Sequence, residues 1–88
     1  MSTILITGAA TGIGRLSAIA LARVGHTVYA TMREPEGRNA ARAESLRTET
    51  AGHDLRVIEL DVQSQDSANQ AVQTVLDEAG GLDVVVHN

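Results

Sequence analysis

Hydrophobic positions along the chain follow two different periods in alternation. Four short runs rich in β-branched and aliphatic residues are typical of buried strands, and they cover residues 3–7, 26–32, 55–62 and 82–87. Between them lie three longer segments in which apolar residues return every three or four positions, as on one face of a helix. These predicted helices cover residues 13–24, 38–50 and 65–79.

The first and third predicted helices have defined apolar faces and end signals. The first should end at Gly25 and pack on the sheet with one face. That face is Ile13, Leu16, Ala20 and Val24. The third should be capped by Ser64, end at Gly80 and present a continuous apolar stripe. That stripe is Ala68, Ala71, Val72, Val75, Leu76 and Ala79. The middle helix has a weak face, mostly alanine with Leu46.

Strands that alternate with helices through short connections predict parallel strands joined by right-handed crossovers. The expected fold class is therefore α/β, a Rossmann-type doubly wound parallel sheet in three α/β/α layers. Only its first four strands and three helices are expected here, with strand order 3-2-1-4. Neither repeats nor linkers interrupt the chain, so residues 1–88 form one domain unit.

The amino-acid composition excludes several classes of partner and of site. Hydrophobic residues make up 43% of the 88 positions but only one is aromatic, Tyr29, so the core must be aliphatic. The net charge of −4, without a basic run, argues against a nucleic-acid or anionic-membrane surface. The absence of cysteine excludes disulfides and thiolate metal sites. Neither a signal peptide nor a membrane span is visible, so we expect a cytoplasmic protein.

A glycine-rich turn follows the first predicted strand. Gly8, Gly12 and Gly14 follow the spacing G-x-x-x-G-x-G and open the first predicted helix. Such a turn brings the backbone close to a pyrophosphate, and the N–H groups around Ile13 and Gly14 form an anion site at the helix N-terminus. An ATP or GTP phosphate loop is excluded, because all seven basic residues are arginine and that loop needs a lysine. The alternative is a glycine-rich turn without a ligand.

Three motifs together resemble the short-chain dehydrogenase/reductase family. They are "TGAATGIG" from Thr7, "LDV" from Leu60 and "VVVHN" at the end of the chain. The last departs from the family's N-N-A-G, because His87 replaces the first Asn and the chain stops before Ala-Gly. The resemblance covers the whole chain, and "TMRE" from Thr31 resembles the pattern of NADP-preferring members, including hydroxysteroid-dehydrogenase-like ones.

The resemblance implies roles for three residues beyond the glycines. Asp61 would hold the adenine amine, with the backbone of Val62 serving the ring, and Asn88 would touch the cofactor ribose and steady the last strand. The alternatives are a carboxylate at Asp61 that only caps the following turn, and an ordinary strand-end polar residue at Asn88.

The end of the second predicted strand indicates which nicotinamide dinucleotide is bound. NAD sites place an acidic residue there for the ribose 2′-hydroxyl, whereas an arginine suits the 2′-phosphate of NADP. By the family pattern Met32 holds the acidic position, and Arg33 and Thr11 would contact the phosphate. We therefore predict NADP, with NAD the less favoured cofactor. A one-residue slip would instead bring Glu34 to the ribose, and Arg33 would pair with Glu34 or Glu36 if it were only a surface residue.

Catalysis in the resembled family depends on a Tyr-x-x-x-Lys pair and a Ser, and this chain holds no such set. Tyr29 lies inside a predicted strand, and Arg33 rather than a lysine follows four residues later. His26, His53 and His87 lack metal-ligand spacing. The chain is thus expected to supply the cofactor-binding half of an NADP(H)-dependent oxidoreductase acting on an alcohol or carbonyl substrate, and to be inactive alone.

Two other functions stay open on sequence grounds. One is a stand-alone, non-catalytic dinucleotide-binding module. The weaker one is an S-adenosylmethionine-dependent methyltransferase, which would favour an acidic residue at Met32. In either case the last predicted strand has no further strand beside it. Such an apolar edge around Val85 favours pairing with another chain, so we expect a homo-oligomer.

Overall fold

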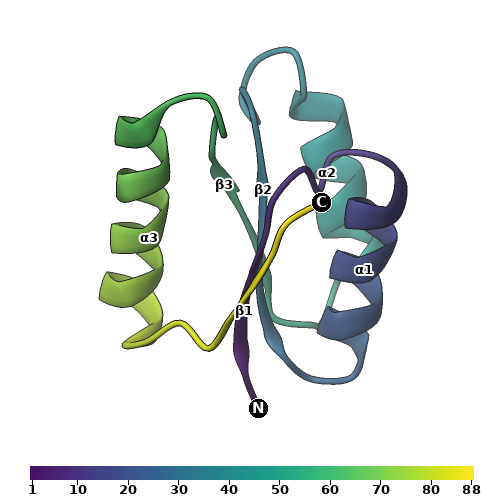
Figure 1. Ribbon diagram of the computed structural model, residues 1–88. Helices are drawn as coiled ribbons and strands as arrows, with labels where there is room; N and C mark the ends of the chain where they lie inside the picture. The colour runs from purple at the N-terminus through teal and green to yellow at the C-terminus, as the bar shows by residue number, and fades with distance from the viewer.

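The computed structural model describes residues 1–88, which form one parallel four-stranded sheet with three helices (Figure 1). The strand order β3-β2-β1-β4 confirms the predicted topology. The elements in chain order are β1 (Thr3–Ile6), α1 (Gly12–Arg23), β2 (Thr27–Met32), α2 (Ala40–Glu49), β3 (Leu55–Glu59), α3 (Gln65–Ala79) and β4 (Val84–Val86).

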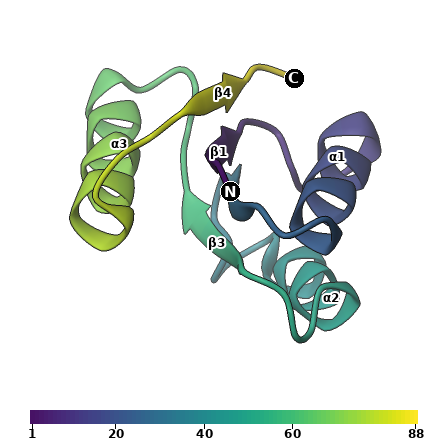
Figure 2. The same ribbon diagram turned by 90° about the horizontal axis from the view of Figure 1, so that it is seen from below.

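The sheet separates two apolar layers (Figure 2). Helices α1 and α2 cover one face, and α3 covers the other. Because side chains alternate along a strand, Ile4 and Ile6 of β1 pack toward α1 and α2 while Leu5 packs toward α3. Strands β1, β2 and β3 therefore contribute to both layers, as expected for a doubly covered parallel sheet.

The edge of the sheet at β4 is open. This strand pairs only with β1, through the register Ile4↔Val84, Leu5↔Val85 and Ile6↔Val86. Val84 and Val85 remain 42% and 46% exposed. The predicted unpaired apolar edge is therefore present in these 88 residues.

Helix α1 packs with a different face from the predicted one. Ile13, Leu16 and Val24 are 73%, 65% and 61% exposed. Three of the buried residues are small, namely Gly14, Ala18 and Ala22, and the fourth is Ile19. Small residues repeated every four positions let the helix lie close to the sheet, whereas the large aliphatic stripe would hold it farther away. The predicted stripe of α3 is also only partly covered, since Ala71 and Val75 are buried but Val72 and Leu76 are exposed.

Close approach at the β1–α1 turn selects this face of α1. Gly8 and Gly12 have positive φ angles of 63° and 61°, which L side chains rarely adopt. At Gly14 the constraint is space, because a Cβ atom there would overlap the carbonyl oxygen of Gly8 and lie 2.8 Å from Nδ2 of Asn88. The start of α1 is thus held directly against the end of β1.

A polar cluster fastens α3 to the other face. Tyr29 of β2 is fully buried, and its hydroxyl donates to Oε1 of Glu78 at 2.9 Å and accepts from Nη1 of Arg56 at 2.8 Å. Arg56 also pairs with Glu78 at 3.1 Å and lies 5.5 Å from the centre of the Tyr29 ring. The cluster therefore links β2, β3 and the last turn of α3.

Gly14→Ala should lower the free energy of unfolding by about 1–3 kcal/mol, because the added methyl must push the start of α1 away from Gly8. Gly81→Ala is the matched control, since a Cβ atom there meets nothing within 4 Å. Denaturant unfolding of both variants measures the difference. Equal stabilities would show that close packing does not constrain this turn.

Tyr29→Phe should destabilise the protein by about 1 kcal/mol near neutral pH, because the buried hydroxyl joins two hydrogen bonds. Burial, reinforced by Glu78 and opposed by Arg56, raises the pKa of Tyr29 above its ordinary value of 10.0. The folded state thus binds this proton more tightly, so the stabilisation is complete below about pH 10 and is lost as pH rises through the raised pKa. Urea unfolding at about pH 8 and about pH 11 should show the wild-type advantage shrinking. An advantage that stays constant would contradict this assignment.

Candidate functional site

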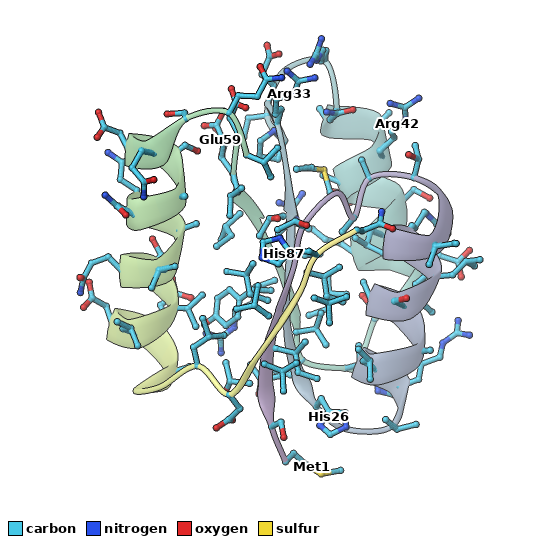
Figure 3. The ribbon with its side chains drawn as sticks, in the orientation of Figure 1. Met1, His26, Arg33, Arg42, Glu59 and His87 are labelled. Atoms are coloured by element: carbon cyan, nitrogen blue, oxygen red, sulfur yellow. The ribbon has the colours of Figure 1, made fainter.

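A cavity of about 510 Å³ opens at the carboxyl ends of the strands. Its walls come from the β1–α1 turn, from the segment that joins β2 to α2, and from the residues that follow β3. The buried side chains of Met32 and Leu60 form apolar parts of the lining. Figure 3 shows Arg33 and Arg42 at this end of the molecule, opposite Met1 and His26. This is the end of an open α/β sheet at which ligands bind.

Of the predicted glycine-turn residues, Gly8 and Thr11 line the cavity, whereas Gly12, Ile13 and Gly14 do not. Thr11 occupies the N-cap position of α1, but its side chain forms no capping hydrogen bond, so the hydroxyl is free for a ligand. The space beside Gly12 is open, because a Cβ atom placed there meets nothing within 4 Å. The first N–H groups of an α-helix have no partner within it. Those of Ile13 and Gly14 therefore lie at the positive end of the helix dipole. The turn can therefore accept an anion.

The end of β2 brings an uncompensated positive charge to the same cavity. Arg33 is exposed, lines the cavity and forms no salt bridge. Arg33 pairs with neither Glu34 nor Glu36, the two partners of the alternative interpretation, and Glu34 pairs with Arg38 at 3.0 Å. Glu34 adopts a positive φ of 47° and lines a separate hollow.

The segment after β3 contributes one carboxylate and one exposed apolar side chain. Asp61 lines the cavity, and one of its oxygens accepts a hydrogen bond from the backbone N–H of Gln63 at 2.9 Å. The backbone N–H of Asp61 donates to Ser67 at 2.9 Å, which fixes the segment to α3. Asp61 thus caps its own turn and still lines the cavity. Val62 beside it is 69% exposed and offers an apolar surface at the cavity.

Asn88 lies beneath the glycine turn and not among the residues that line the cavity. Its side-chain amide donates to the carbonyl oxygen of Gly8 at 3.2 Å, and its backbone N–H donates to the hydroxyl of Thr7 at 3.0 Å. These contacts tie the end of β4 to the end of β1. The expected role of Asn88 in steadying the strand stays a prediction with which these two hydrogen bonds are compatible.

Among the cavity residues that the sequence analysis missed are three from one segment, namely Arg38, Asn39 and Arg42. They lie at the start of α2, a segment whose weak apolar pattern gave no reason to look for a site. Arginines 33, 38 and 42 outnumber the single carboxylate of Asp61 in the lining. The cavity is thus positive in a chain whose net charge is −4.

Two further properties of the chain bear on its chemistry. The His and acidic residues form no group of three or more that could hold a metal ion. None of the helices combines the length and the apolar character needed to cross a membrane.

Comparison with known proteins agrees with the geometry of this site. The sequence model described as short chain dehydrogenase matches residues 2–88. The chain is 41% identical over 88 residues to an uncharacterized oxidoreductase of Myxococcus xanthus, covering 98% of this chain and 33% of that protein. It is 35% identical over 86 residues to an NADPH-dependent pterin aldehyde reductase of Arabidopsis thaliana, covering 98% of this chain and 34% of the relative.

Solved structures give the same result. A short-chain type dehydrogenase/reductase from Mycobacterium ulcerans superposes with a TM-score of 0.82 at 32% identity, over 98% of this chain and 31% of that one. The chain therefore spans about a third of the length of these relatives. The match to the family model excludes the methyltransferase alternative, and this chain belongs to the short-chain dehydrogenase family, whose members use nicotinamide cofactors.

Proposed function

We propose that this chain is the NADP(H)-binding part of an oxidoreductase that acts on an alcohol or carbonyl substrate. The observation that carries the proposal is the end of β2, where the buried Met32 holds the position of an NAD-type carboxylate and Arg33 beside it has no salt bridge. The pterin aldehyde reductase relative is described as NADPH-dependent, which supports the same cofactor here.

The residues present fit the adenosine end of such a cofactor. A cavity of about 510 Å³ is within the usual range for small-molecule sites. In this proposal the adenine ring lies against Val62 with its amine at Asp61, and the pyrophosphate lies at the N–H groups of Ile13 and Gly14. The open space beside Gly12 leaves room for that approach.

The ribose region explains the proposed preference for the phosphorylated cofactor. A free 2′-hydroxyl needs a hydrogen-bond acceptor at the end of β2, and Met32 provides none. Glu34 does not substitute for it, because its carboxylate is paired with Arg38 and lines another hollow. A 2′-phosphate would find the Arg33 guanidinium and the free hydroxyl of Thr11.

The cofactor, when bound, supplies or accepts the hydride, and the residues of this chain bind and orient it. The general acid/base and the substrate pocket are not among these 88 residues, so the proposed catalytic groups belong to the remaining length that the relatives have. Tyr29 is excluded as a catalytic acid, because its hydroxyl is buried between Glu78 and Arg56 on the α3 side of the sheet.

Arg33→Ala should weaken NADP binding by about 1–3 kcal/mol, the size of a lost charge-assisted contact, and leave NAD binding almost unchanged. Calorimetric or fluorescence titration of the full-length protein with both dinucleotides measures this. Arg47→Ala is the control, because Arg47 pairs with Glu44 and lies outside the cavity. Equal losses for both dinucleotides in the Arg33 variant would contradict the assignment to the 2′-phosphate.

Met32→Asp should shift the preference toward NAD. A carboxylate at this position can accept from the ribose 2′-hydroxyl and repels a 2′-phosphate. The ratio of the two dissociation constants should move by about tenfold or more, which corresponds to about 1.4 kcal/mol. Because Met32 is buried, a thermal melt must accompany the titrations. A folded variant whose preference does not change would show that the ribose lies elsewhere.

A further inference from the structure

Asn39 occupies the N-cap position of α2 but does not cap the helix. An N-cap asparagine ordinarily accepts a hydrogen bond from a backbone N–H of the first turn. Here the side-chain oxygen accepts from Nη1 of Arg42 at 3.1 Å, and the side-chain amide donates to the backbone carbonyl of Arg33. Asn39 is only 8% exposed, so its position is fixed by its surroundings. One buried side chain thus holds both the backbone of one arginine and the guanidinium of another.

Arg42 resembles Arg33 in its surroundings. Both line the cavity, and neither forms a salt bridge, whereas Arg38 between them is paired with Glu34. Figure 3 shows the two at the same end of the molecule, Arg33 at the tip of β2 and Arg42 on α2. The cavity therefore has two arginines that are not paired with a carboxylate.

The position of Arg42 within its helix is unfavourable for folding alone. It lies in the first turn of α2, which contains no acidic residue, and a cation near a helix N-terminus opposes the helix dipole. Asn39 meanwhile gives up a capping bond to hold the same side chain. The cation in the first turn and the missing cap bond both run against helix stability, and both place positive charge at the cavity.

We propose that Arg42 is a second residue that binds the 2′-phosphate, and that Asn39 is the positioning residue for both arginines. The inference rests on the proposed NADP preference and adds a specificity-determining residue to it. Two guanidinium groups approach one phosphate from separate elements, the end of β2 and the start of α2. The phosphate has enough acceptor oxygens for both.

The decisive experiment compares Arg42→Ala with Arg47→Ala on the same helix. Full-length protein is titrated with NADP, with NAD, and with the pair adenosine 2′,5′-bisphosphate and AMP, which differ only in the 2′-phosphate. Arg42→Ala should weaken NADP and the bisphosphate by roughly three- to thirtyfold and leave NAD and AMP within about twofold. Arg47→Ala removes the same charge from outside the cavity and should change none of the four.

Asn39→Asp separates positioning from helix stability. Aspartate is as good an N-cap residue as asparagine, so α2 should remain folded. It cannot donate to the carbonyl of Arg33, and its charge neutralises Arg42. The NADP-to-NAD preference should therefore fall by about the same factor as in Arg42→Ala. A thermal melt must show that the variant is folded, because a carboxylate oxygen then faces the carbonyl of Arg33. An unchanged preference would overturn the positioning role of Asn39.

The outcomes distinguish this inference from the proposed function. If Arg33→Ala selectively weakens NADP while Arg42→Ala does not, the second phosphate contact is wrong and the cofactor assignment stands. If the wild-type protein binds NAD and AMP as tightly as their phosphorylated counterparts, the NADP proposal itself fails. A parallel loss of all four ligands in Arg42→Ala would give Arg42 a purely structural role and overturn the inference.

Discussion

The contact between Gly14 and the carbonyl of Gly8 sets the geometry on which the rest of the structure depends. No side chain fits between them, so the first turn of α1 lies directly on the end of β1. Asn88 completes the arrangement, because its amide donates to the same carbonyl and ties β4 to the turn. The first N–H groups of α1 and the β1–β4 pair are thereby placed by one close packing contact.

The same contact explains where the sequence pattern predicted the fold correctly and where it did not. The strands and their order follow from alternating periodicity and short connections, and the structure confirms both. The predicted packing face of α1 is wrong. Large aliphatic residues such as Leu16 predicted that face, but Ala18 and Ala22 are the residues that are buried. A helix brought so close to a sheet must bury its small residues. The glycine spacing alone does not show that Gly14 touches the carbonyl of Gly8, and it is this contact that explains the small-residue face.

The sequence predicted the site residues that directly follow a strand, but not those that the fold brings to the site from the start of α2. The glycine turn, Arg33 and Asp61 each stand next to a strand end, so sequence position alone brings them to one edge. Asn39 and Arg42 lie at the start of α2, and the fold brings this segment to the cavity. In the sequence, the two residues look like the start of an ordinary capped helix. Only the diversion of the Asn39 side chain from its cap to Arg33 and Arg42 distinguishes them.

In the proposed function, cofactor binding and cofactor discrimination belong to separate parts of this fold. The turn after β1 would offer backbone N–H groups to a pyrophosphate, which both nicotinamide dinucleotides share, and the start of α1 is constrained by packing against Gly8 and Asn88. The groups proposed to recognise the 2′ position lie between β2 and α2, where Arg33 and Arg42 are exposed and make no contact with the glycine turn's packing. Substitutions in that segment can therefore alter the charge facing the ribose while the sheet and the start of α1 keep their geometry. Under the proposal, cofactor choice is a property of the segment between β2 and α2, and affinity for the common pyrophosphate is a property of the turn after β1.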